Sequence, residues 1–230
     1  MPLAIVTGTS RGLGRALAER LLAQGWSVHG FVRAPDGWAP PGFVAHTVDV
    51  GDPAAVRAAV AAVTADGATI DLLVNNAGVA AMNALLLTPP EVAAELMRVN
   101  YLGSFHCLQA VGKAMVRARR GRILNVTTVA VPLALEGEAA YVASKAAVEA
   151  LTRVAARELA PHGVVVAAVG LGPVDTRLTR AVGAAPLARL NDRIGRPAGT
   201  TVGEAVDFLL RHASDPRLAG GSIHYLATLP

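Results

Sequence analysis

Short runs of apolar residues alternate along this chain with longer segments in which apolar residues recur every three or four positions. A short apolar run bounded by polar residues or glycine predicts a buried strand, and a spacing of three to four predicts a helix. The segments that predict strands are 3–7, 27–32, 44–50, 71–74, 122–127, 164–169 and 222–225. The segments that predict helices are 12–24, 53–64, 90–96, 100–118, 139–160, 177–190 and 202–212.

Strands that alternate with helices in this order predict an α/β fold with a parallel sheet and helices on both faces. No change of composition marks a boundary between domains, and no repeat is visible along the chain. We therefore expect a single domain over residues 1–230. Residues 34–42 contain three prolines and two glycines, which predict a loop between the second and third strands.

A glycine-rich turn, Thr7-Gly8-Thr9-Ser10-Arg11-Gly12-Leu13-Gly14, joins the first predicted strand to the first predicted helix. Glycines at such a turn let the backbone approach a pyrophosphate, and the helix N-terminus offers unpaired N–H groups. The spacing, Gly-x3-Gly-x-Gly, differs from the commoner dinucleotide-binding pattern. By itself the turn is also compatible with an ordinary connection. The residues of this turn that we expect to contact a cofactor are Gly8, Ser10, Arg11, Gly12, Leu13 and Gly14.

Two further motifs give the turn a context. Asn75-Asn76-Ala77-Gly78 follows the fourth predicted strand, and Tyr141-Val142-Ala143-Ser144-Lys145 lies near the start of the long helix 139–160. Together the three motifs resemble the short-chain dehydrogenase/reductase family, from residue 3 to about residue 226. The resemblance implies a doubly wound Rossmann fold with seven parallel strands in the order 3-2-1-4-5-6-7. It also implies a nicotinamide cofactor and an enzyme that interconverts a carbonyl and an alcohol.

Tyr141 and Lys145 are the candidate catalytic pair. They are four residues apart on a predicted helix and therefore share one face. An ammonium beside a phenol favours the phenolate, so we expect Lys145 to lower the pKa of Tyr141. Tyr141 is then an acid in reduction and a base in oxidation. The resemblance adds that Lys145 binds the hydroxyls of the nicotinamide ribose. An exposed Tyr–Lys pair without a catalytic role is the alternative.

Thr128 and Asn100 complete the expected catalytic set. Thr128 lies 13 residues before Tyr141, at the end of the fifth predicted strand. The family usually has serine there, whose hydroxyl holds the substrate oxygen; threonine offers the same hydroxyl but a stiffer, bulkier side chain. Thr127 is expected to be an ordinary strand residue. The resemblance implies that Asn100 holds a water molecule that connects Lys145 to solvent. Asn100 could also cap or kink the helix, and the two roles are compatible.

The resemblance assigns the remaining cofactor contacts. Asp49, at the end of the third predicted strand, corresponds to the acid that accepts a hydrogen bond from the adenine amino group. Asn76 corresponds to a residue that mainly supports the sheet, and Leu171 departs from the proline that is usual there. The other residues expected at the cofactor are Val50, Ala77, Gly78, Gly172, Val174 and Thr176.

The residues after the second predicted strand favour NADP(H) over NAD(H). An acid at this point binds the ribose 2′-hydroxyl, whereas arginine accommodates a 2′-phosphate. This chain has Val32 followed by Arg33, and Arg11 lies in the glycine turn. Two guanidiniums suit a phosphate dianion. Asp36, the nearest acid, is expected to lie too far into the loop to compete.

The expected substrate pocket is apolar, formed by residues 79–82, residues 129–135 and Leu178. It has no arginine or lysine for a carboxylate, which favours a neutral or acyl-type ketone, while Glu136 and Glu138 could reach its rim. Residues 177–197 are expected to close over the substrate as a lid. In the branch that reduces 3-oxoacyl groups on acyl carrier protein, Arg119 matches one docking position. The second position holds His162, so docking of this carrier is a weaker expectation.

Composition excludes several other classes of function. Hydrophobic residues make up 53% of the chain and charged residues 17%, which is typical of a globular protein with a large core. The net charge is +4, but the basic residues are scattered apart from residues 117–122. Aromatic residues amount to only 4%, so binding to nucleic acid is a minor alternative. A single cysteine, Cys107, and dispersed histidines give no metal-ligand pattern.

The sequence also bears on location and assembly. A strand predicted at residues 3–7 leaves no room for a signal peptide, and no apolar run is long enough to span a bilayer, so we expect a cytoplasmic protein. Helices 100–118 and 139–160 carry small and apolar residues on several faces, which favours a homodimer or homotetramer. A non-catalytic NADP(H)-binding regulator with this fold is the alternative function; the intact set of Asn100, Thr128, Tyr141 and Lys145 argues against it.

Overall fold

The computed structural model describes residues 1–175 and 184–229 of the chain. Over these residues it contains one seven-stranded sheet of parallel strands in the order β3-β2-β1-β4-β5-β6-β7, which confirms the predicted fold class. The strands are β1 (Leu3–Thr7), β2 (Ser27–Val32), β3 (Phe43–Thr47), β4 (Leu72–Asn75), β5 (Gly121–Thr128), β6 (Val164–Leu171) and β7 (Ile223–Tyr225).

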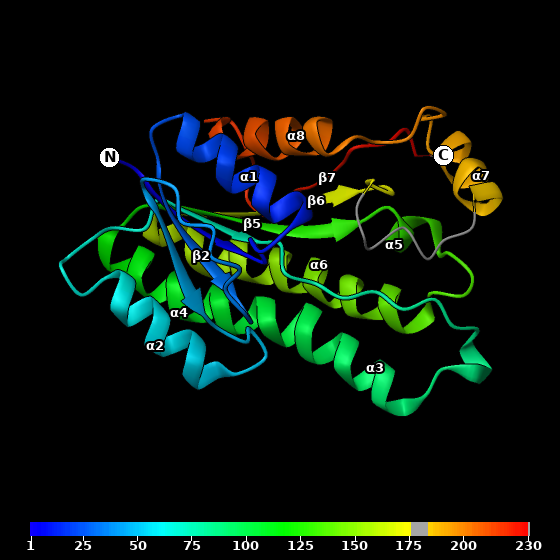
Figure 1. The fold of residues 1–230 in the computed structure, drawn as a ribbon, viewed down its shortest axis with the longest axis horizontal. Helices are drawn as coiled ribbons and strands as arrows, with labels where there is room; N and C mark the ends of the chain where they lie inside the picture. The colour runs from blue at the N-terminus through cyan, green and yellow to red at the C-terminus, as the bar shows by residue number, and fades with distance from the viewer. Residues whose placement is uncertain (176–183, 230) are drawn as a thin grey trace.

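Helices cover both faces of the sheet (Figure 1). The α-helices are α1 (Gly12–Ala23), α2 (Pro53–Val63), α3 (Pro90–Leu96), α4 (Gly103–Ala118), α5 (Ala130–Leu133), α6 (Ala139–Leu159), α7 (Ala184–Arg193) and α8 (Val202–Ser214). Two short 3-10 helices, η1 (Leu85–Leu87) and η3 (Ala160–His162), and a π-helix, η2 (Met97–Leu102), complete the regular structure. Helices α1 and α8 lie on one face, and α2, α4 and α6 lie on the other.

Neighbouring residues of each central strand point to opposite faces, so each strand contributes to two apolar layers. In β1, Ile5 packs toward α2 and α4, whereas Val6 packs toward α1 and α8. Leu73 and Leu72 of β4 divide in the same way. Strands buried on both faces need apolar residues at every position, which explains why they appear in the sequence as continuous apolar runs.

Several element boundaries differ from those predicted. The third strand ends at Thr47, not at residue 50, so Asp49 lies in the turn that follows it. The predicted helices 90–96 and 100–118 form one continuous helix, because the π-helix η2 bridges them. Strands β5 and β6 extend one and two residues beyond their predicted ends. The helix predicted over 177–190 and the lid predicted over 177–197 both begin in residues 177–183, which lie outside the described residues. The described helix that follows them is α7.

The parallel strands all point their carboxyl ends toward the same edge of the sheet. The glycine turn follows β1, Asn76 follows β4, and Thr128 ends β5, so this edge gathers the candidate site residues. Ligands of open α/β sheets bind at this edge, near the strand where the order of connections reverses, which here is β1. Within residues 1–175 and 184–229, no helix is long and apolar enough to cross a membrane.

Candidate active site

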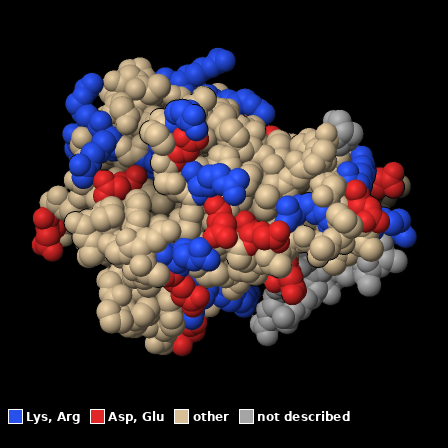
Figure 2. All heavy atoms as spheres, turned by 90° about the horizontal axis from the view of Figure 1, so that it is seen from above, with Lys and Arg blue, Asp and Glu red and all other residues tan. Residues whose placement is uncertain are grey.

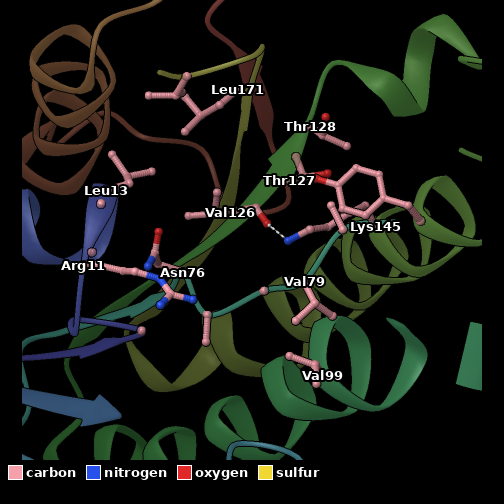
Figure 3. Close-up of a pocket in the computed structure, with 18 of the residues that line it drawn as sticks. Arg11, Leu13, Asn76, Val79, Val99, Val126, Thr127, Thr128, Lys145 and Leu171 are labelled. Carbon is pink, nitrogen blue, oxygen red and sulfur yellow. Dashed lines mark hydrogen bonds between the residues drawn. The ribbon is translucent and has the colours of Figure 1, made fainter. Parts of the chain in front are cut away.

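A cleft of about 1510 Å³ lies at the carboxyl edge of the sheet. It runs from the glycine turn and the end of β2 to the start of α6, and its walls include Gly8, Arg11, Tyr141 and Lys145. Figure 3 shows Arg11, Leu13 and Asn76 at one end and Thr128 and Lys145 at the other. One cleft therefore brings together the three motifs that are far apart in the sequence.

The glycine turn leaves room for a ligand only because three of its residues lack side chains. Gly8 and Gly12 have positive φ angles, +78° and +58°, which favour glycine. A Cβ atom on Gly14 would lie 2.3 Å from the carbonyl oxygen of Gly8 and 2.5 Å from Nδ2 of Asn76. Helix α1 therefore starts in close contact with the end of β1, with its N-terminal N–H groups facing the cleft. This arrangement fits the pyrophosphate of a dinucleotide.

Asn76 fixes the loop after β4 to the end of β1. Its Nδ2 donates to the carbonyl oxygen of Thr7 at 2.9 Å, and its own N–H donates to Thr7 Oγ1 at 3.0 Å. The N–H of Ala77 donates to the same hydroxyl at 2.8 Å. Asn76 thus serves the architecture of the site, in line with the supporting role expected for it, while Asn76, Ala77 and Gly78 also line the cleft.

Tyr141 lies in the first turn of α6, and its phenol belongs to the wall of the cleft. Burial raises its pKa to about 12; the charge of Glu138 acts in the same direction, and a hydrogen bond with Thr128 lowers it. The lowering of this pKa expected from the Lys145 ammonium is therefore wrong for the chain alone, because desolvation of the buried phenol is the largest effect and the charge of Glu138 adds to it. At neutral pH the phenol is protonated and can give up its proton to a substrate.

Lys145 is buried, with only 6% of its surface exposed. Its Nζ donates to the backbone oxygen of Val126 at 2.8 Å, the contact drawn in Figure 3. Burial lowers its pKa to about 8. An ammonium has three donors, and one of them is used in contacts with the described residues. The other two match the ribose hydroxyls that the resemblance assigns to Lys145.

Thr127 and Thr128 have different surroundings at the end of β5. Thr127 donates to Oε1 of Glu149 on α6 at 2.9 Å, so its hydroxyl is bonded within the fold. Thr128 Oγ1 accepts from the N–H of Ala130 at 3.2 Å and forms the hydrogen bond with Tyr141 that lowers the pKa of the phenol. The geometry therefore favours Thr128, rather than Thr127, as the hydroxyl beside the reacting oxygen.

Asn100 lies in the π-helix η2 and is fully buried. Its Nδ2 donates to the carbonyl oxygen of Val79 and to Ser144 Oγ, both at 2.9 Å, and its Oδ1 accepts from the N–H of Val79 at 2.9 Å. Ser144 Oγ in turn donates to the backbone oxygen of Tyr141 at 2.7 Å. Asn100 therefore links the loop after β4 to the turn of α6 that carries Tyr141. π-Helices are frequent at functional sites.

Asp49 is held by Arg98, a residue that no motif of the sequence indicates. Its Oδ2 accepts from Arg98 at 3.0 Å, and its Oδ1 accepts from the N–H of Gly51 at 2.9 Å. Arg98 also donates to both carboxylate oxygens of Glu95. Arg33 lies close enough to contribute to the lowered pKa of Asp49 and of Glu95. The only trace of Arg98 in the sequence is its i,i+3 spacing from Glu95.

The two arginines expected at a 2′-phosphate, Arg11 and Arg33, both line the cleft. Neither forms an ion pair with a residue that the structure describes. The expectation that Asp36 lies too far along its loop is wrong, because Asp36 belongs to the same wall. Its loop returns toward α1, where Asp36 forms an ion pair with Arg15.

The far end of the cleft is mostly apolar. The expected residues Val79, Met82, Val129 and Leu135 line it, and α7 adds Leu187 and Leu190. Glu136 and Glu138 also line this end, where Glu138 is half-buried and its pKa is raised by burial. Val50, Gly172 and Val174, which are expected at the cofactor, line the cleft, and Leu171 lines it too. Thr176 and Leu178 lie outside the described residues.

Arg119 and His162, the candidate docking residues for an acyl carrier protein, lie at the opposite edge of the sheet. Arg119 lies two residues before β5 and donates to the backbone oxygen of Pro161, next to His162, at 3.4 Å. β5 has eight residues, so its first and last residues lie roughly 23 Å apart at a rise of about 3.3 Å per residue. A partner bound at Arg119 would therefore be remote from Thr128 of the same chain.

Comparisons with known proteins identify the family of the chain. The sequence profile of the family described as short chain dehydrogenase matches residues 2–186. The 3-oxoacyl-acyl-carrier-protein reductase FabG of Vibrio cholerae is 34% identical, over 90% of this chain and 88% of that protein. FabG of Escherichia coli is 32% identical over 96% of this chain and 94% of that protein. The 3-oxoacyl-acyl-carrier-protein reductase of Synechocystis is 36% identical over 99% of this chain and 90% of that protein.

Proposed function

Because this chain belongs to the short-chain dehydrogenase/reductase family and is an oxidoreductase, we propose that it reduces a ketone or a 3-oxoacyl group to a secondary alcohol with NADPH. The observation that carries the proposal is the single cleft that joins the glycine turn to Tyr141, Lys145 and Thr128. Loss of a proton donor at this point would have favoured the non-catalytic alternative.

The chain's own residues supply the acid chemistry. A bound nicotinamide supplies the hydride. The Thr128 hydroxyl and the Tyr141 phenol then hold the carbonyl oxygen, and Tyr141 gives it a proton as negative charge develops there. The high pKa of Tyr141 keeps the phenol protonated at neutral pH, which is the form that donates a proton in reduction. Lys145 holds the ribose and places positive charge near the phenol that loses its proton.

The adenosine end of the cleft supports NADPH as the reductant. Arg11 and Arg33 face this end without ion-pair partners among residues 1–175 and 184–229. A 2′-phosphate carries the dianionic charge that two guanidiniums bind well. Asp49, which is held by Arg98 and lines this end, is proposed to accept a hydrogen bond from the adenine amino group.

The lining of the far end supports a neutral substrate. Apolar side chains dominate this wall, and besides Lys145 the charged residues described there are the acids Glu136, Glu138 and Asp175. A carboxylate beside the carbonyl would be repelled. The relatives are named for 3-oxoacyl groups on acyl carrier protein. We infer that this chain accepts ketones or acyl thioesters, and that docking of the carrier is weakened by His162. Residues 177–197 are proposed to close over the substrate.

A panel of ketones, quinones and acyl thioesters, followed by NADPH absorbance, tests the proposal. We expect turnover with at least one ketone or 3-oxoacyl thioester. Tyr141→Phe should lower kcat by about 10²–10⁴-fold, because it removes the proton donor. NADPH affinity, measured by calorimetry, should stay unchanged in that variant. If the wild-type protein binds NADPH but reduces none of the compounds in the panel, the result would instead support the alternative function, a non-catalytic NADP(H)-binding regulator.

The chain is proposed to assemble as a homodimer or homotetramer through α4 and α6. Ala143, Ala150 and Val154 form an exposed line of small apolar residues along α6, and Leu102 is exposed at the start of α4. On the face shown in Figure 2, basic and acidic side chains are interspersed, which gives no support to a nucleic-acid surface there.

A further inference from the structure

The adenosine end of the cleft contains two carboxylates that could repel a 2′-phosphate, Asp36 and Asp49. Each is paired with an arginine that does not itself line the cleft: Asp36 with Arg15, and Asp49 with Arg98. The two pairs leave Arg11 and Arg33 as the free guanidiniums of this wall among the described residues. The charge that a cofactor meets here therefore depends on both pairs.

The Arg15–Asp36 pair is held from several sides. Arg15 Nε donates to the carbonyl oxygen of Thr9 at 3.0 Å, and its Nη2 donates to that of Ser10 at 3.1 Å. The guanidinium also lies over the ring of Trp38, with its central carbon 4.1 Å from the ring centroid. These contacts fix Arg15 between the glycine turn and the loop after β2, where it meets Asp36.

Asp36 is held by the same loop. The N–H of Trp38 donates to its Oδ1 at 3.2 Å, and Gly37 between them has a φ of +81°, which favours glycine. Trp38 packs on Phe43 of β3 with ring centroids 4.3 Å apart, so the loop is tied to the sheet. The Trp38 N–H and the Arg15 guanidinium keep the pKa of Asp36 below its ordinary value. Asp36 is therefore negatively charged at neutral pH.

We propose that Arg15 is a residue that determines cofactor specificity: it holds and neutralises Asp36, so that this wall accepts a 2′-phosphate. The inference rests on the proposed preference for NADPH. Without the guanidinium, Asp36 would leave an uncompensated carboxylate beside the ribose. A carboxylate in this part of the fold accepts a hydrogen bond from the 2′-hydroxyl of NADH and repels the phosphate of NADPH.

Binding of NADPH and NADH by isothermal titration calorimetry tests this without any substrate. Arg15→Met should lower the preference, the ratio of the Kd for NADH to the Kd for NADPH, by about tenfold at low ionic strength. Asp36→Asn combined with Arg15→Met should restore the wild-type ratio to within about twofold, because it removes the carboxylate. Arg33→Asp serves as the positive control for a lost preference.

Arg20→Met is the matched control. Arg20 lies on the same helix and forms a similar ion pair, 2.7 Å from Asp207, outside the cleft. The Arg20→Met variant should leave the preference for NADPH over NADH unchanged. If Arg15→Met weakens both cofactors equally and Asp36→Asn does not restore binding, Arg15 only supports the glycine turn and the inference is wrong. Wild-type protein that binds NADH as tightly as NADPH would overturn the proposed cofactor, and this inference with it.

Discussion

At the scale of single residues, the site depends on two ionisable groups that burial moves in opposite directions. The phenol of Tyr141 has its pKa raised to about 12, and the ammonium of Lys145 has its pKa lowered to about 8. Both shifts favour the uncharged form, as expected where water is excluded. Tyr141 therefore keeps its proton until a substrate oxygen needs it, and the fold bears a cost for burying Lys145.

That cost gives a pH-dependent prediction. Burial lowers the pKa of Lys145 from 10.5 to about 8, so above pH 8 the unfolded chain binds a proton that the folded chain has lost. Rising pH therefore stabilises the wild type. Relative to Lys145→Met, its free energy of unfolding should increase by about 2–3 kcal/mol between pH 7 and pH 10. Urea denaturation at several pH values measures this difference.

The chain's other lysine provides the control. Lys113 is exposed on α4. The difference in stability between Lys113→Met and the wild type should stay constant over the same pH range, because this side chain is solvated in both states. If the difference in unfolding free energy between Lys145→Met and the wild type is also constant between pH 7 and pH 10, Lys145 is not buried as an ammonium in the folded chain.

At the scale of elements, the close approach of α1 to the end of β1 decides whether the cleft can form. A Cβ on Gly14 would lie 2.3 Å from the carbonyl oxygen of Gly8, an atom that cannot move without disturbing the turn. Gly203, near the start of α8, has only Thr201 Oγ1 within reach, at 3.9 Å from such a Cβ. The two glycines thus offer the same substitution in two different environments.

Gly14→Ala should destabilise the protein by about 3 kcal/mol, through overpacking against backbone, and should abolish detectable NADPH binding. Gly203→Ala should stabilise α8 by about 0.5 kcal/mol, because alanine loses less backbone entropy in a helix. Urea denaturation and calorimetry measure both effects. Equal stability of the two variants would mean that the contact between α1 and the turn is looser than described.

At the scale of the whole molecule, α6, the helix that carries Tyr141, also carries exposed apolar residues on its outer face. The inner face of α6 holds Lys145 and packs on the sheet, whereas Val154 on the outer face is 56% exposed. A helix with both faces apolar favours a partner on its solvent side. The proposed dimer would therefore stabilise the element that positions Tyr141.

Val154→Asp should convert the assembly to a monomer or a smaller oligomer, because it places a charge at the proposed contact. Size-exclusion chromatography with light scattering measures the mass in solution. Val44→Asp, the same change at a valine of β3 that is 46% exposed, should leave the mass unchanged. A wild-type protein that is itself monomeric at micromolar concentration would contradict the proposed assembly.

The sequence by itself determined the strands of the sheet, the glycine turn and which residues to expect at the site. The spacing of apolar residues and the length of apolar runs are local properties of the sequence, so they predict strands and helices without knowledge of tertiary contacts. They failed at the ends of elements: β3 ends at Thr47, because Asp49 and Asp52 begin a turn, and the π-helix around Asn100 joins two predicted helices.

Only the tertiary structure decided which charges meet. Arg15 and Asp36 are 21 residues apart and Arg98 and Asp49 are 49 apart, so neither pair has a local signal. The direction in which the pKa of Tyr141 shifts could likewise be found only from the tertiary structure. The i,i+4 spacing from Lys145 indicates that the two side chains are close, but not that they are buried. The two ion pairs depend on how the loops after β2 and β3 fold back on the helices, and the burial of Tyr141 depends on the packing of α6 in the wall of the cleft. Both are properties of the assembled sheet.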